Sequence, residues 1–233
     1  MSEIRQAITK SVIGLAAFAA LTAGLIATTQ LLTTERIEQQ KKLSQSRALR
    51  EIFPNQYHDN EFLDDIVTLP ESDQLGSHEP LQGFLSRKAG QVNGVLIPAV
   101  APDGYSGKIR LITGIESNGK IAGVRVLEHR ETPGLGDKIE PRKSDWIQHF
   151  VGKSLVNPSA NNWKVVKDGG EFDQLTGATI TPRAIVKAVY GTLIYFDRHN
   201  TYLLGVDTKD YSKRDNQSAA GEKISAGDKQ SEP

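Results

Sequence analysis

The chain has 233 residues, no cysteine, and 28 basic and 28 acidic side chains, so its formal net charge is zero. This length suits one well-buried domain with appendages rather than two domains. The balanced charge gives no basic excess for binding nucleic acid. The lack of cysteine excludes disulfides, thiol catalysis and cysteine-ligated iron–sulfur clusters. If the protein moves electrons, it must therefore do so on an organic cofactor.

The N-terminal region contains a long apolar segment. Residues 11–34 carry no charge, and as a helix they span roughly 36 Å at ~1.5 Å per residue, enough for a bilayer core of ~30 Å. Arg5 and Lys10 precede this segment, so the positive-inside rule predicts that residues 1–10 are cytoplasmic and that the main domain is periplasmic. The alternative is a cleaved signal peptide with Ala17-Phe18-Ala19 as its cleavage site. The apolar run continues well past those alanines, which favours a retained anchor in a bacterial inner membrane.

The rest of the chain divides by composition. Residues 35–53 are charged and glutamine-rich, with apolar side chains at helical spacing, which predicts a juxtamembrane helix. We expect the globular domain over residues 54–207. Its first part, residues 54–90, has acidic clusters and repeated Pro and Gly, which indicate irregular structure with short elements. Residues 208–233 are polar and predict a disordered tail.

The globular part mixes strand and helix patterns. Strand-like segments are expected at residues 92–100, 108–115, 120–128 and 163–166. Ser117-Asn118-Gly119, between two of them, is a hairpin signal. Helices are expected at residues 144–151 and 181–199. These patterns predict an α+β domain built on antiparallel strands.

Several familiar catalytic patterns are missing. The five histidines have neither His-x-x-x-His nor His-Glu-x-x-His spacing, so a catalytic zinc site has no support. Residues 114–120, GIESNGK, imitate a phosphate-binding P-loop, but Ile121 follows the lysine where that loop needs Ser or Thr. Neither a Gly-x-Ser-x-Gly elbow nor a Gly-x-Gly-x-x-Gly fingerprint occurs, which argues against a serine hydrolase or a Rossmann dinucleotide site.

The stretch 173–182, DQLTGATITP, has three threonines and a Gly-Ala pair directly before a helix start. We expect Thr181 to be the N-cap, and Pro182 suits the first helical turn, where a missing N–H is tolerated. The free N–H groups and the positive dipole end of this helix then face the threonines, which makes a site for a phosphate. For Gly-Ala-Thr taken alone, a tight connection before a helix is the alternative.

A second stretch, residues 129–138 with the sequence HRETPGLGDK, is interpreted as a strand end that continues into a loop. Pro133 fixes one backbone angle, and Gly134 and Gly136 permit close approach of the backbone to a ligand. Glu131 and Thr132 supply polar groups. As an isolated loop, the stretch would be a turn with a solvated charge.

The two stretches together carry a family resemblance. The first matches the acceptor motif for covalent flavin attachment, Asp-x-x-(Ser/Thr)-Gly-Ala-Thr, at Asp173, Thr176, Gly177, Ala178 and Thr179. The second resembles the His-x-Glu-Thr-Pro-Gly-Leu-Gly segment of the same FMN-binding domain. Most of the chain resembles the G subunit of Rnf-type ion-translocating electron transport complexes, a relative of the C subunit of the sodium-translocating NADH:quinone reductase.

The resemblance implies a cofactor and roles for individual residues. In this family a flavin transferase esterifies the last threonine of the motif with the phosphate of FMN, taken from FAD. The implied attachment point is therefore Thr179, as phosphothreonyl-FMN. Thr181 competes for this role, but we prefer Thr179 because the motif ends there and Thr181 is expected to cap the helix. The phosphate-side shell is Thr176, Gly177, Ala178 and Thr181, and the ring- or ribityl-side candidates are Glu131, Thr132, Gly134, Leu135 and Gly136. His129 is a further candidate for a flavin contact, with a structural hydrogen bond as the equal alternative.

The implied function is a covalent-FMN electron relay within a membrane-bound complex. In the family, the whole complex exchanges electrons between ferredoxin and NAD while it moves sodium ions or protons. The expected partners are the other membrane, flavin and iron–sulfur subunits, and the flavin transferase that matures the chain. We therefore expect enzymatic activity only as a subunit. Two alternatives stay open: a stand-alone periplasmic flavin reductase, and a membrane-anchored scaffold domain without flavin.

Overall fold

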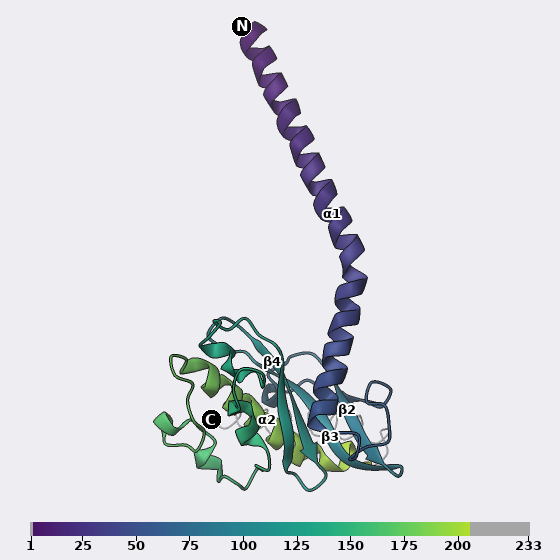
Figure 1. The fold of residues 1–233 in the computed structure, drawn as a ribbon, viewed down its shortest axis with the longest axis vertical. Coiled ribbons are helices and arrows are strands. Elements are labelled where there is room, and N and C mark those ends of the chain that lie inside the picture. The colour runs from purple at the N-terminus through teal and green to yellow at the C-terminus, as the bar shows by residue number, and fades with distance from the viewer. Residues whose placement is uncertain (1, 206–233) are drawn as a thin grey trace, which may run out of the picture. The chain divides into compact units, whose positions relative to one another are not determined.

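The computed structural model describes residues 2–205, in two units that divide after Gln45. The first element, α1 (Ser2–Ile52), is one continuous helix that includes both the expected membrane segment and the expected juxtamembrane helix (Figure 1). Within it, Glu3–Thr34 is long and apolar enough to cross a membrane. Threonine hydroxyls in this segment donate to carbonyls one turn earlier, as Thr28 does to Gly24 at 2.7 Å. Polar side chains in a membrane-spanning helix are satisfied in this way. The tail expected at residues 208–233 lies outside the described residues.

The second unit contains a five-stranded antiparallel sheet in which each strand pairs with the next one along the chain (Figure 1). Its strands are β1 (Ile66–Leu69), β2 (Leu81–Lys88), β3 (Gln91–Ala101), β4 (Ile109–Glu116) and β5 (Ile121–Glu128). The three strands expected between residues 92 and 128 are confirmed, and so is the hairpin, where the Gly119 N–H donates to the Glu116 carbonyl at 2.9 Å. The α+β class is therefore confirmed.

The main core lies on one face of the sheet, under the long helix α2 (Ile180–Leu203). Successive side chains of a strand point to opposite faces, so only alternate strand positions enter this core. Val95 and Ile97 of β3 are fully buried here, and Ile185 and Val189 of α2 belong to the same cluster. α2 begins one residue before the predicted helix and continues to Leu203.

A smaller core covers the opposite face of the sheet. Leu96 of β3 and Ile112 of β4 point to this face and cluster with Leu49, Ile52 and Phe53, at the end of α1 and just after it. Residues from Ser46 onward belong to the second unit. The last turn of α1 is therefore part of the globular domain, and the domain has helical cover on both faces of its sheet.

Two strands formed where we predicted irregular structure. β1 and β2 both fall within residues 54–90. β1 has only four residues, and β2 contains Gly83 at a point where a Cβ would lie 3.1 Å from Leu69 Cδ1. A strand that short, and a glycine required by packing, both weaken the composition signal that marks strands.

The strand predicted at residues 163–166 is wrong. Val165 forms only a single bridge, with Phe172, and Val166–Asp168 is a 3₁₀ helix, η5. The apolar character of this segment comes instead from an aromatic cluster, in which the Trp163 ring lies 4.9 Å from Phe172 and 5.3 Å from Tyr190. The helix predicted at residues 144–151 is also 3₁₀, as η3 (Trp146–Phe150). The other 3₁₀ helices are η1 (Asp73–Leu75), η2 (Gly136–Ile139) and η4 (Ala160–Asn162).

Candidate functional site

The N-terminus of α2 differs from the prediction in which threonine caps it. Thr179, not Thr181, occupies the N-cap position, and its side chain makes no capping hydrogen bond. Thr181 is the second residue of the helix, is fully buried, and donates its hydroxyl to Oε2 of Glu131. The predicted cap is wrong because a buried carboxylate from another segment takes the hydroxyl that would otherwise bond the local backbone.

The two sequence stretches meet at one cavity of about 280 Å³. Thr179, which is partly exposed, lies on its wall. A helix of this length presents unpaired N–H groups and a partial positive charge at its first turn. The cavity residues come from three segments: Tyr105, Glu131, Thr132, Leu135, Gly136, Gly177, Ala178, Thr179, Ile180 and Thr181.

Glu131 joins these three segments. Its side chain is 4% exposed. Oε1 accepts a hydrogen bond from the Ser106 backbone N–H at 3.0 Å, and Oε2 accepts from the Thr181 hydroxyl. A buried carboxylate is costly unless donors satisfy it, and here each oxygen has a protein donor. Glu131 thus fixes the first turn of α2 against the loop that follows β3. Its predicted contact with a flavin remains a prediction.

Two glycines allow the loops to close around the cavity. At Gly136 a Cβ would lie 2.9 Å from Glu131 Oε2 and 3.1 Å from Thr181 Oγ1, so a side chain would break up the buried network. Gly177 has φ +82°, and a Cβ there would lie 2.7 Å from Leu135 Cδ2. Gly136 and Gly177 are therefore explained by packing between the two stretches.

Three of the predicted contacts lie outside the cavity lining, namely His129, Gly134 and Thr176. The His129 ring is used within the loop: Nδ1 accepts from the Glu131 backbone N–H at 3.1 Å, and Nε2 lies 3.1 Å from Glu140 Oε1. The structure thus gives His129 a role in holding Glu131. Its contact with a flavin stays untested.

Asp137 anchors the same loop. Its side chain is almost completely buried and accepts a hydrogen bond from Lys143 Nζ at 2.5 Å. The Lys143 ammonium, and after it the Gly134 backbone N–H, lower the pKa of the Asp137 carboxyl below its ordinary value of 3.8. The same pairing raises the pKa of Lys143. The loop that carries Glu131, Leu135 and Gly136 is therefore held by a charged pair.

Arg183, in the first turn of α2, pairs with Asp168 outside the cavity. Its guanidinium donates to both carboxylate oxygens of Asp168, each at 2.6 Å, which lowers the pKa of that carboxyl. Arg183 is not among the cavity residues. An anion in the cavity would thus meet backbone N–H groups rather than this side chain.

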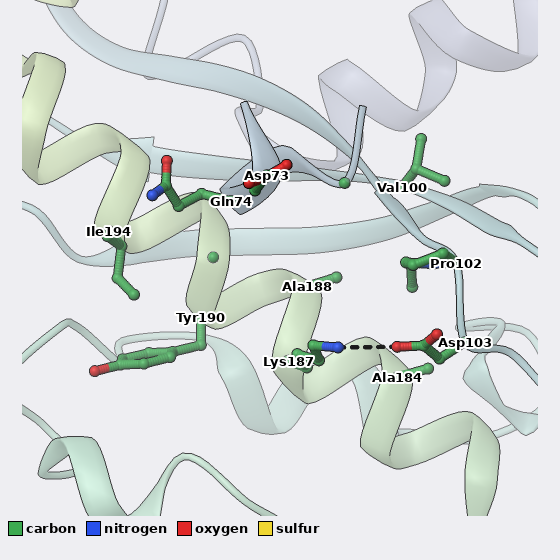
Figure 2. Close-up of a pocket in the computed structure, with 13 residues that line it drawn as sticks. Asp73, Gln74, Val100, Pro102, Asp103, Ala184, Lys187, Ala188, Tyr190 and Ile194 are labelled. Atoms are coloured by element: carbon green, nitrogen blue, oxygen red, sulfur yellow. Dashed lines mark hydrogen bonds and ion pairs between the residues drawn. The ribbon is translucent and has the colours of Figure 1, made fainter. Parts of the chain in front are cut away.

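A second cavity, of about 320 Å³, lies between α2, η1 and the end of β3 (Figure 2). Its α2 wall is made of small residues such as Ala184, Ala188 and Gly191. Lys187 and Asp103 point toward one another and form an ion pair at 2.9 Å (Figure 2). Although this cavity is larger, it contains no residue of either sequence stretch and no hydroxyl of the acceptor motif. The cavity at Thr179 is therefore the candidate site.

Two cavity residues, Ile180 and Tyr105, were not among the predicted contacts, and only Tyr105 lies outside both sequence stretches. It belongs to a turn, Gly104-Tyr105-Ser106-Gly107, in which the Gly107 N–H lies 3.4 Å from the Gly104 carbonyl. The available signal was an aromatic residue between turn glycines after a strand, a pattern that does not itself point to a ligand.

Comparison with known proteins agrees with this picture. The family model described as "FMN-binding domain" matches residues 104–193, and that described as "RnfG N-terminal region" matches residues 1–52. The chain is 48% identical over 198 residues to the G subunit of the ion-translocating oxidoreductase complex of Vibrio vulnificus, covering 85% of this chain and 93% of that one. It is 44% identical over 201 residues to the G subunit of the same complex from Shewanella piezotolerans, covering 86% and 95%.

Among solved structures, the chain is similar to the C subunit of the Na(+)-translocating NADH-quinone reductase from Parabacteroides distasonis. The TM-score is 0.43 with 20% sequence identity, over 59% of this chain and 69% of that one. This similarity is too distant to support conclusions about individual residues. The identity to the Vibrio and Shewanella relatives, over nearly their full length, shows the family: the chain belongs to the G subunits of ion-translocating oxidoreductase complexes.

Proposed function

We propose that this chain carries FMN as a phosphoester on Thr179 and relays electrons within a membrane-bound ion-translocating oxidoreductase complex. The observation that carries the proposal is Thr179 itself, whose side chain makes no capping bond and which is partly exposed on a cavity wall at the start of α2. The match of residues 104–193 to the FMN-binding domain supports the cofactor. When bound, FMN supplies reversible uptake and release of electrons, which no side chain in this cavity provides.

The residues present fit a flavin mononucleotide. The first turn of α2 has backbone N–H groups and a positive dipole end for the phosphate. Gly177 and Ala178 leave space beside the acceptor hydroxyl, and Thr132 supplies a polar group on the facing loop. Leu135 and Ile180, both large and partly exposed, offer apolar surface to the ring. The cavity volume, about 280 Å³, suits part of such a ligand, since small-molecule sites occupy ~300–1,000 Å³.

The attachment reaction explains why the acceptor must be accessible. The Thr179 Oγ forms a bond to the FMN-side phosphorus of FAD, the phosphoanhydride bond breaks, AMP leaves, and the hydroxyl proton passes to a base of the flavin transferase. A second enzyme must therefore reach this oxygen. Thr179 is partly exposed, whereas Thr181 is fully buried and bonded to Glu131. Burial thus favours Thr179 over Thr181.

The test is intact and peptide mass spectrometry of the full chain expressed with a flavin transferase. An FMN-sized adduct is expected on wild type and Thr181→Val, and none on Thr179→Val. Thr181→Val leaves Glu131 with an unpaired oxygen and should cost about 1–3 kcal/mol of stability, so Thr181→Ser, which keeps the hydroxyl, is the matched control. An adduct lost only in Thr181→Val would move the attachment point. No adduct on wild type, with the transferase active on another substrate, would favour a scaffold without flavin.

We further propose an N-in topology in a bacterial inner membrane. The apolar part of α1 would span the bilayer, and residues 54–207 would lie in the periplasm, where the transferase acts. The partners would be the complex's other membrane, flavin and iron–sulfur subunits, and activity would require them. Purified alone, the chain should reduce soluble acceptors only slowly and without specificity. Rapid turnover by the isolated chain would favour a stand-alone flavin reductase instead.

A further inference from the structure

Tyr105 is an exposed aromatic side chain on the wall of the cavity at Thr179. Its side chain is 67% exposed although it lines a concave site. Within residues 2–205, its ring has no aromatic neighbour and its hydroxyl has no hydrogen-bond partner. Tyrosine normally buries much of its ring, so this arrangement leaves an aromatic face without a protein neighbour, while water satisfies the hydroxyl.

The backbone beneath Tyr105 is held in place. The Ser106 N–H donates to the buried Glu131 carboxylate at 3.0 Å, and Glu131 in turn holds Thr181 of α2. On the other side of the turn, Asp103 pairs with Lys187 of α2 at 2.9 Å (Figure 2). The buried Glu131 link is the firm one, because Asp103 and Lys187 are both largely exposed. Tyr105 is exposed on a fixed backbone, not on a loose loop.

The neighbours of Tyr105 share its character. Leu135, on the facing loop, is 41% exposed, and Ile180, next to the acceptor threonine, is 42% exposed. Both line the same cavity. Large apolar side chains that are exposed to solvent around a concave site indicate that the site binds an apolar ligand. The polar groups, by contrast, gather at the N-terminus of α2.

We infer that Tyr105 stacks on the isoalloxazine ring of the attached FMN. This inference rests on the proposed function and assigns the ring-side contact within it. Aromatic side chains stack on planar heterocycles, and a fixed backbone lowers the entropy lost when they do so. Glu131 is then a positioning residue: it holds the Tyr105 turn and the first turn of α2 together, so that the phosphate end and the ring end of the site keep a constant separation.

The experiment compares flavin fluorescence in the full chain expressed with a flavin transferase. The variants are Tyr105→Leu, Tyr105→Phe and, as a matched control, Tyr57→Leu, which removes a 47% exposed tyrosine outside the cavity. Mass spectrometry first gives the adduct on each. A stacked tyrosine quenches flavin fluorescence by transferring an electron to the excited flavin, which returns it by charge recombination. Phenylalanine also stacks but is a poorer electron donor. Brightness per flavin therefore reports electron donation, and fluorescence anisotropy reports stacking.

We expect Tyr105→Leu to be several-fold brighter per flavin, with lower anisotropy. Tyr105→Phe should be brighter but retain the wild-type anisotropy, and Tyr57→Leu should match wild type. Equal brightness of wild type and Tyr105→Phe, with the adduct intact, would overturn the inference and leave the proposed function standing. Loss of the adduct in Tyr105→Leu, with unchanged fluorescence in Tyr105→Phe, would overturn it in favour of a contact with the transferase. No adduct on wild type would overturn the proposed function and this inference together.

Discussion

The proposed function depends on one residue, Thr179, although Thr181 offers the same hydroxyl two positions away. The difference between them is burial. Thr181 is fully buried, and its proton is already directed to Glu131. A phosphorus centre as large as that of FAD can reach a buried oxygen only if the first turn of α2 opens, which also breaks the Glu131 network. Thr179 needs no such opening, so the choice of acceptor follows from packing rather than from intrinsic reactivity.

Gly177, in the acceptor turn, is the first residue at which the packing can be tested. Gly177→Ala places a Cβ 2.7 Å from Leu135 Cδ2 at φ +82°. The left-handed backbone costs about 1 kcal/mol for a non-glycine residue, and displacement of Leu135 adds about 1–3 kcal/mol. We expect a lower melting temperature and lower FMN occupancy, measured by thermal denaturation and flavin absorbance. Gly134→Ala is the control, because Gly134 has φ +77° but open space around it. Equal effects of the two substitutions would show that the contact with Leu135 does not matter.

The Asp137 carboxylate should make the stability of the cavity loop depend on pH. Its folded-state pKa is lowered, chiefly by Lys143, so the stability it contributes is present above 3.8, its ordinary value, and is lost as the pH falls through the lower folded-state value. Asp137→Asn should lower the melting temperature at neutral pH and reduce the further loss on acidification below 3.8. Thermal melts of the full chain at a series of pH values test this. An unchanged acid dependence in Asp137→Asn would assign the effect to other carboxylates.

At the residue scale, the sequence was informative where the chemistry is local. The small size of Gly177, chosen within one stretch, is matched by its close contact with Leu135, and the acceptor role of Thr179, implied by the resemblance, stays a prediction. The cap at Thr181 was mispredicted because its true partner, Glu131, lies far away in sequence, and a local capping rule cannot include a distant buried carboxylate. Tyr105 was missed for a similar reason, since its role depends on which loops meet at α2.

At the scale of elements, the last turn of α1 packs against glycines of the sheet. Gly114 of β4 pairs with Gly123 of β5 and with Leu96 of β3. A Cβ at Gly114 would lie 2.2 Å from Ile52 Cγ2, and one at Gly94 would lie 2.5 Å from Phe53 Cζ. These missing side chains form a groove that Ile52 and Phe53 fill. Glycine weakens a strand, so its presence here reflects close packing.

Filling this groove should destabilise the domain, and a neighbouring glycine outside the tight contact provides the matched control. Gly114→Ala should destabilise the domain by about 1–3 kcal/mol, because the added methyl overpacks against Ile52. Gly123→Ala should have little effect, since its Cβ would meet Ile52 at an ordinary 3.5 Å. Urea denaturation of the full chain measures both. In an Ile52→Ala background, which itself should cost about 2–5 kcal/mol, the penalty of Gly114→Ala should shrink. An undiminished penalty there would mean that the groove does not act through Ile52.

Elements were predictable where their pattern was long and regular. β3, β4 and β5 are rich in apolar residues over eight or more positions, an Asn-Gly turn joins β4 to β5, and all three strands were found. β1 has four residues, too few for a period to be visible. The segment at Trp163 was mistaken for a strand because its large apolar residues serve an aromatic cluster and not a ladder. Tertiary contacts, absent from local composition, decided both cases.

At the scale of the whole molecule, α1 belongs to two environments. Its apolar part, Glu3–Thr34, has the length and composition of a membrane span, and its last residues complete the smaller core of the domain. Residues 35–53, which join these parts, contain neither Pro nor Gly, so the sequence has no residue there that would break the helix. The second compact unit begins at Ser46, and the domain boundary at residue 54 stays a prediction.

The proposed orientation of this helix leads to the last prediction. Arg5 and Lys10 lie on the N-terminal side of the apolar segment, and the positive-inside rule retains such charges in the cytoplasm. Because the chain has no cysteine, a single introduced thiol reports one position only. In intact spheroplasts, a membrane-impermeant maleimide should label Lys120→Cys, on the exposed turn before β5, and should not label Glu3→Cys. Both should react after permeabilisation, which controls for thiol accessibility. Labelling of Glu3→Cys alone in intact spheroplasts would reverse the orientation and put the cavity at Thr179 in the cytoplasm.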